Sequence, residues 1–136
     1  METTTINQDI RAFYVTASSF PDGVLAAHQQ LHAIVPFDEK RRYFGLSRPE
    51  NDGGIVYHAA AEEIHPGEAE ELGFKMLVLK KGTYVSVTIE DFMKDIPSIE
   101  RAFKELLSYP QLDPEGYCVE LYLNQKDVQC MIRLAD

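Results

Sequence analysis

The segment GYCVELYLNQKDVQCMIRL, residues 116–134, decides the fold that we predict. Apolar and polar residues alternate in both of its arms around the turn-forming stretch NQKD, which is the pattern of a β-hairpin. A two-residue turn at Gln125–Lys126 predicts a register in which Glu120 pairs with Met131. Three side chains of the first arm then point away from the helices: Cys118, Glu120 and Tyr122.

The same order of patterns occurs twice along the chain. Pro36 and Tyr43 recur 74 residues later as Pro110 and Tyr117, and in each half they connect a helical pattern to a strand pattern. The expected elements are strands at 11–17, 43–48 and 55–61 with a helix at 21–34, and strands at 83–89, 117–123 and 128–134 with a helix at 96–108. The segment 62–81 is expected to be a surface connection that leads into an extra or lengthened strand.

These patterns predict an α+β fold. Two duplicated β-α-β-β units are related by pseudo-two-fold symmetry, with antiparallel sheets around a concave ligand groove and helices on the other face. Because no Ser/Gly-rich linker separates the halves, we expect a single domain over residues 1–136, with pseudo-repeats at about 9–62 and 74–136.

Composition narrows the class of function. The chain has 136 residues, of which 45% are hydrophobic and 26% are charged, as in a globular domain. Thirteen basic against twenty-two acidic residues give a net charge of −9, which disfavours nucleic-acid binding. No apolar run is long enough for a membrane span or a secretory signal, so we expect a cytoplasmic protein. Two cysteines make neither a disulfide framework nor a four-ligand zinc site, and neither metal nor cofactor is expected.

Strand alternation gathers a candidate ligand site on the face away from the helices. Glu120 lies there among aromatic and polarisable side chains, and such an apolar face is either covered or used. A carboxylate beside aromatic rings suits a hydrophobic cation. Arg133 on the same face is a competing partner for Glu120. The candidate ligand-binding residues are Glu120, Tyr122, Tyr84, Tyr14, Phe44, Met131, Cys118 and His58.

Three stretches of this sequence resemble the GyrI-like small-molecule-binding domains, also called bacterial transcription-activator effector-binding domains. They are KKGTYVSV at 80–87, DFMKDIPSIERAFKELLSYP at 91–110 and GYCVELYLNQKDVQC at 116–130. The resemblance implies a groove in which an acidic residue meets cationic aromatic ligands, and it assigns that acid to Glu120. Regulators of this family carry a helix-turn-helix segment before the domain. Only about nine residues precede the first expected strand, so the chain resembles a stand-alone member.

Three functions follow, and the first is favoured over an enzyme. In the first hypothesis, the protein binds a hydrophobic, aromatic or cationic small molecule, as a sensor, a drug-sequestering protein or an effector-binding module. Alternatively, it hydrolyses strained cyclopropane-containing compounds, with Glu120 as base or electrostatic stabiliser and Tyr84 or Tyr122 as hydrogen-bond donor. A third hypothesis is an acidic inhibitor that docks on a basic nucleic-acid enzyme such as gyrase, with the protein partner otherwise unknown.

Two further side-chain pairs receive a structural interpretation. His28 and His32 are four residues apart on the predicted helix, but AHQQLH lacks the acidic residue of the HExxH zinc motif. We expect them to pack rather than to bind metal. Cys118 with His58 as its base is a weak candidate for a nucleophile, because neither position is secured by the pattern.

Overall fold

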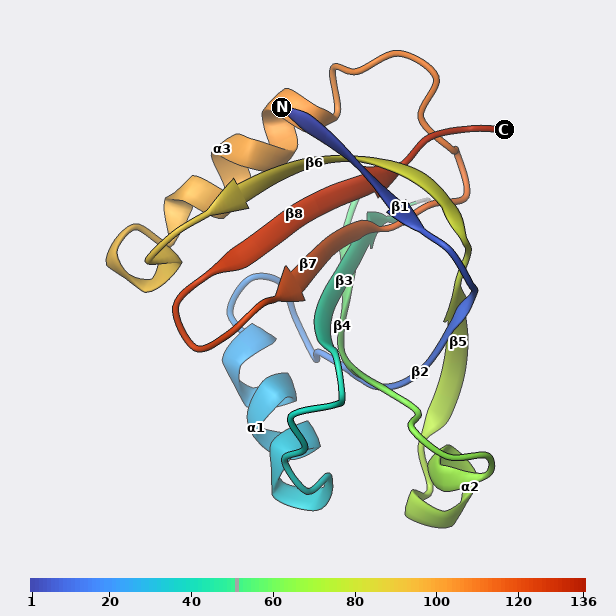
Figure 1. The fold of residues 1–136 in the computed structure, drawn as a ribbon. Coiled ribbons are helices and arrows are strands. Elements are labelled where there is room, and N and C mark those ends of the chain that lie inside the picture. Colours follow the sequence, from blue (N-terminus) through green and yellow to red (C-terminus); the bar gives the residue numbers. More distant parts are fainter. Residues whose placement is uncertain (51) are drawn as a thin grey trace.

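Eight strands form one strongly curved antiparallel sheet in the order β1-β6-β8-β7-β3-β4-β2-β5 (Figure 1). The structure, a computed structural model, describes residues 1–50 and 52–136. The strands are β1 (Glu2–Ile6), β2 (Ile10–Thr16), β3 (Tyr43–Pro49), β4 (Ile55–Glu62), β5 (Lys75–Leu79), β6 (Gly82–Ile89), β7 (Cys118–Tyr122) and β8 (Val128–Arg133). The predicted α+β class is confirmed, with a single continuous sheet in place of separate ones.

The helices lie on the outer face of the curved sheet (Figure 1). They are α1 (Val24–Ile34), α2 (Glu68–Leu72) and α3 (Pro97–Leu106), with a short 3₁₀ turn, η1 (Phe92–Lys94), before α3. α1 packs on β2 and β4, while α3 packs on β6 and β8. The central strands β3 and β7 therefore run between the two main helices. None of the helices in the described ranges is long and apolar enough to cross a membrane.

Local sequence explains how each main helix seats on the sheet. In α3, Ala102, Phe103 and Leu106 form a buried stripe over β6 and β8, and Pro97 begins the first turn, where its missing N–H has no helical partner to lose. Under α1, β4 offers Ala59 and Ala61. These short side chains allow the helix to approach the sheet closely.

The order β2-α1-β3-β4 recurs as β6-α3-β7-β8, and the strand that precedes each unit pairs with the other unit. β1 pairs with β6, and β5 pairs with β2. The extra strand expected before residue 81 is confirmed as β5, although α2 lies in the segment predicted to be a surface connection. β1 was not predicted, since its partner lies about 80 residues away: Thr4 pairs with Tyr84.

The register predicted for the β7–β8 hairpin is wrong by one residue. Glu120 pairs with Cys130, not with Met131. The turn contains three residues rather than two, because the Asn124 side chain accepts hydrogen bonds from the backbone N–H groups of Lys126 at 2.7 Å and Asp127 at 2.9 Å. The side chains of β8 point to the faces predicted for them, whereas those of β7 point to the opposite faces of the sheet. Cys118, Glu120 and Tyr122 consequently face the helices.

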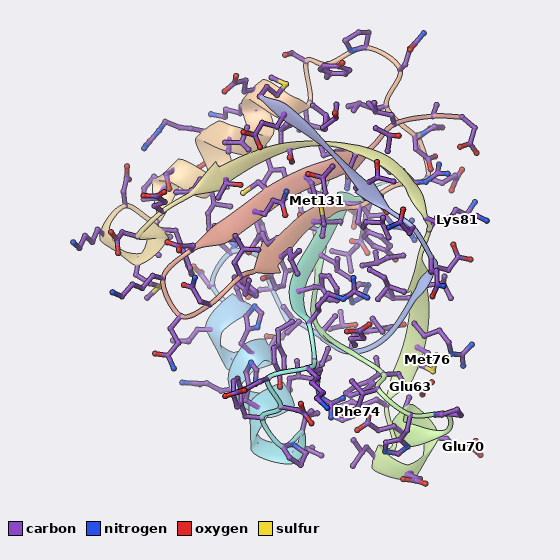
Figure 2. All side chains as sticks on the ribbon, in the orientation of Figure 1. Glu63, Glu70, Phe74, Met76, Lys81 and Met131 are labelled. Atoms are coloured by element: carbon purple, nitrogen blue, oxygen red, sulfur yellow. The ribbon has the colours of Figure 1, made fainter. Side chains whose placement is uncertain are left out.

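Side chains fill the space that the curved sheet encloses, and Met131 is among them (Figure 2). Phe44, Leu46 and Met131 are almost fully buried there. Both faces of the sheet are therefore covered, one by the helices and one by the curvature of the sheet itself.

Candidate functional site

The helix side of the central strands has one position with no side chain, Gly45 of β3. Gly45 pairs with Glu120 of β7 on one side and with Ala59 of β4 on the other. The hydroxyl of Tyr57, a β4 residue, lies directly over it. A Cβ atom at position 45 would be 2.1 Å from the Tyr57 hydroxyl oxygen and 2.9 Å from Glu120 Oε1. Glycine is required here because the phenol occupies the space of a side chain.

A hydrogen-bonded network surrounds the Glu120 carboxylate. The Tyr122 hydroxyl donates to Glu120 Oε1 at 2.6 Å, and the Tyr57 hydroxyl lies 3.4 Å from the same oxygen. His28 of α1 brings Nε2 to 2.8 Å from the Tyr57 hydroxyl and 3.4 Å from that of Tyr122. Three elements, α1, β4 and β7, thus bring four polar side chains together.

Burial controls the protonation of this network. Glu120 is only 9% exposed, and burial raises the pKa of its carboxyl group, although the two tyrosine donors oppose the shift. Burial and the neighbouring carboxylate raise the pKa of Tyr57 and Tyr122, so both phenols stay protonated. Burial, assisted by the nearby His32, lowers the pKa of His28 to about 4. Neutral His28 and the Tyr57 hydroxyl share a hydrogen bond at Nε2, in which the imidazole tautomer decides which group donates.

A groove of about 680 Å³ opens beside this network. α1, the loop after it, η1 and the β7–β8 turn form its walls. Tyr122 separates the Glu120 carboxylate from this space, with its ring 5.5 Å from His28 and 6.0 Å from Phe92. The exposed apolar side chains along the groove are Leu25, Phe37, Met93 and Leu123. The groove therefore offers aromatic faces, an apolar rim and a buried carboxyl group behind one wall.

The sheet divides the predicted site residues into two sets. Glu120, Tyr122 and Cys118 lie on the helix side with the groove, which corrects the single face predicted for all of them. The one-residue change in register is the cause, because successive strand residues point to opposite faces. The residues on the enclosed side are Tyr84, Tyr14, Phe44, Met131 and His58.

Several predicted pairings are also corrected. Arg133 binds Asp113 and Asp136 at 2.9 Å each, on the face opposite Glu120. Cys118 and His58 lie on opposite faces of the sheet, so they do not form a nucleophile pair. The Cys118 thiol is partly buried, which raises its pKa to about 11.

Sequence reasoning missed three of the groove and network residues. His28 was expected only to pack, yet it bonds to Tyr57 and lines the groove. Its spacing of four from His32 was the available signal, because residues four apart share one helix face. Tyr57 gave no signal of its own. Tyr43, which pairs with Tyr122, also faces the groove.

No protein-family model matches the sequence, and no curated protein matches it at a significant level. Solved structures do match the fold. An integron cassette protein, VCH_CASS2, from the mobile metagenome of Vibrio cholerae has a TM-score of 0.70 and 15% identity, over 98% of this chain and 94% of the other. SAV2435 bound to tetraphenylphosphonium has a TM-score of 0.71 and 12% identity, over 98% and 92%.

A third similar structure is a candidate bacterial transcription regulation protein from Staphylococcus aureus MU50. It has a TM-score of 0.61 and 12% identity, over 99% of this chain and 97% of the other. With identities of 12–15%, these likenesses show the shared fold alone. The chain has the α+β, groove-forming fold that this set of proteins shares.

Proposed function

We propose that this chain is a small-molecule-binding domain of the GyrI-like type, which holds a hydrophobic, aromatic cation in the groove between α1 and the β7–β8 turn. One observation carries the proposal. A buried carboxylate, Glu120, lies immediately behind an aromatic wall of an apolar-rimmed groove. The role is that of a sensor, a drug-sequestering protein or an effector-binding domain.

The energetics of the groove favour a cation. Each suitably placed aromatic ring contributes roughly 0.5–2 kcal/mol of cation–π attraction. Burial raises the pKa of Glu120 and so disfavours its ionised form. A cation bound nearby favours the ionised form again, and the ionised carboxylate attracts the cation. The net charge of −9 adds a weaker, long-range attraction for positive ligands.

The structural comparison supports the same class of ligand. SAV2435, whose fold this chain shares, was observed with tetraphenylphosphonium, an aromatic cation. The similarity with a candidate transcription regulator fits an effector-binding role. Both observations concern other proteins. They support the proposal for this chain because the fold is shared.

Calorimetric titration with tetraphenylphosphonium tests the proposal. We expect saturable binding to the wild type and a loss of at least about tenfold in affinity in Glu120→Gln, because the charge is removed while the shape is kept. Glu105→Gln makes the same change at an exposed site on α3 and should bind like the wild type. If the wild type does not bind, or both variants bind equally well, the role proposed for Glu120 is wrong.

The hydrolase alternative now rests on fewer residues. Glu120 and Tyr122 remain together, whereas Tyr84 lies on the enclosed side and donates its hydroxyl to the Lys80 carbonyl at 2.7 Å. Turnover of a strained cyclopropane substrate that disappears in Glu120→Gln, with binding retained, would favour hydrolysis over binding alone. The docking alternative predicts a salt-sensitive complex with a basic protein.

A further inference from the structure

The buried carboxyl group of Glu120 has phenols and thiols around it, but no fixed cation. Tyr57 and Tyr122 are its hydrogen-bond donors, both to Oε1, and among the described residues no hydrogen bond reaches Oε2. The other titratable side chains of the neighbouring strands that face it are the thiols of Cys118 and Cys130. An ionised carboxylate in these surroundings has lost its water without gaining an ionic partner.

The arginines on the two sides of the central strands are paired with other carboxylates. Arg133 binds Asp113 at 2.9 Å, on the face of the sheet opposite Glu120. Arg41 is the only lysine or arginine that lines the groove in the described part of the chain, and it donates to both carboxylate oxygens of Glu68, at 2.7 and 2.8 Å. A positive charge that balances an ionised Glu120 therefore has to come from a ligand.

The other titratable side chains of the groove do not supply this charge near pH 7. His28 and His32 project from α1, and burial lowers the pKa of both imidazoles, that of His28 to about 4. Both are therefore largely neutral near pH 7. Tyr43, Asp38 and Glu39 also line the groove, and none of these residue types carries a positive charge.

We propose that the groove exchanges a proton for its ligand: binding of an aromatic cation releases the proton of the Glu120 carboxyl group. This inference rests on the proposed function and adds to it a control of affinity by pH. In the exchange, the O–H bond of the carboxyl group breaks, its electron pair stays on the oxygen, and the proton passes to the buffer. The buried carboxylate is then formed only when a cation is present to balance it.

Thermodynamic linkage gives the direction and the size of the effect. Opposite charges separated by one aromatic ring, on the order of 7 Å, change an equilibrium constant roughly fiftyfold at an effective dielectric constant of about 20. The bound cation lowers the pKa of Glu120 by the same factor by which loss of the proton strengthens cation binding. Burial raises this pKa in the free protein, so affinity should increase with pH. At low pH it should approach the affinity of Glu120→Gln, which stays uncharged.

Calorimetric titration with tetraphenylphosphonium in phosphate and in Tris measures the released proton, because the two buffers differ in their enthalpy of protonation. The ligand is permanently charged and contributes no proton itself. For the wild type, we expect affinity to rise at least about tenfold from about pH 5.5 to about pH 8, with a release of at least about half a proton per bound cation within this interval. Triphenylphosphine oxide, which is aromatic but uncharged, should release no proton. This comparison requires no variant.

Matched variants assign the proton to its residue. Glu120→Gln should release none and should bind tetraphenylphosphonium equally well at both ends of the pH interval. Glu105→Gln makes the same change at an exposed site on α3 and should behave like the wild type. Release that persists in Glu120→Gln comes from another group, such as His32, and would overturn the proposal.

The same titrations separate this inference from the proposed function. If the wild type binds tetraphenylphosphonium without releasing a proton and with constant affinity, the exchange is refuted and cation binding in the groove stands. If the wild type does not bind this cation at any pH in the interval, both proposals are wrong.

Discussion

Replacing Gly45 by alanine places a methyl group where the Tyr57 hydroxyl lies. The new Cβ would be 2.1 Å from the hydroxyl oxygen and 2.9 Å from the ring carbon that carries it. Ordinary contact begins at 3.4 Å, so the phenol has to retreat by about 1.3 Å. Such a movement disturbs the 2.8 Å hydrogen bond between Tyr57 and His28.

The expected loss of stability combines two effects. Overpacking a close-packed site costs roughly 1–3 kcal/mol, and a lost hydrogen bond in a buried network costs about 1 kcal/mol more. Gly45→Ala should therefore lower the free energy of unfolding by about 2–4 kcal/mol. In a chain of this size, that corresponds to a fall in Tm of roughly 6–15 °C. Ligand affinity in the groove should fall as well, because Tyr57 and Tyr122 are hydrogen-bonded at 3.2 Å.

Urea denaturation of a double-mutant cycle measures the effect. Tyr57→Phe removes the clashing oxygen, so it should recover part of the stability lost in Gly45→Ala, although it costs stability when made alone. We expect a coupling energy of about 1 kcal/mol or more between the two positions. A Gly45→Ala protein within about 0.5 kcal/mol of the wild type would refute the placement of Tyr57 over the glycine.

Three further predictions concern titration and reactivity. Because burial raises the folded-state pKa of Glu120, the wild type loses stability as pH rises from the unfolded-state pKa through the folded-state pKa. Glu120→Gln should therefore be the more stable protein at pH 7–8 in urea denaturation. A stability advantage of Glu120→Gln that persists unchanged below about pH 4 would contradict this. The pKa of His28 is lowered from 6.5 to about 4, so stability should fall by up to about 3 kcal/mol as pH drops through that interval, and His28→Gln should flatten the pH profile of Tm. Burial raises the pKa of Cys118 to about 11 and that of Cys130 to about 12. Both thiols should therefore react slowly with an aromatic disulfide at pH 8 until urea unfolds the chain. If Cys118 reacts in the native protein at the rate of a free thiol, its partly buried position is wrong.

Local periodicity was sufficient for most of the sheet. The strands expected at 43–48 and 55–61 are present as β3 and β4. Phe44 pairs there with Ala60, and Leu46 with His58, because a period of two and a buried face together restrict the register. The prediction for the β7–β8 hairpin was wrong at its turn. Two- and three-residue loops both suit NQKD, and the choice depends on where the Asn124 carbonyl oxygen finds its donors.

The candidate site was harder to predict because its parts meet only in three dimensions. Glu120 and Tyr122 are two residues apart on one strand, so their shared face was evident whichever way that strand turned. Tyr57 reaches them across Gly45, and His28 reaches them from α1. Neither contact has a sequence pattern, since each depends on the packing of distant elements. Their roles in ligand binding stay predictions.

The exchange of edge strands between the two units sets an order of events during synthesis. β1 is synthesised before the strand with which it pairs. Thr4 can form its pair only after Tyr84, which is translated 80 residues later. At the usual 5–20 residues per second this delay is roughly 4–16 s. A waiting strand exposes unpaired backbone groups to any other nascent chain. Its sequence, ETTTI, has three threonines and a single large apolar residue, so it can remain hydrated until its partner emerges.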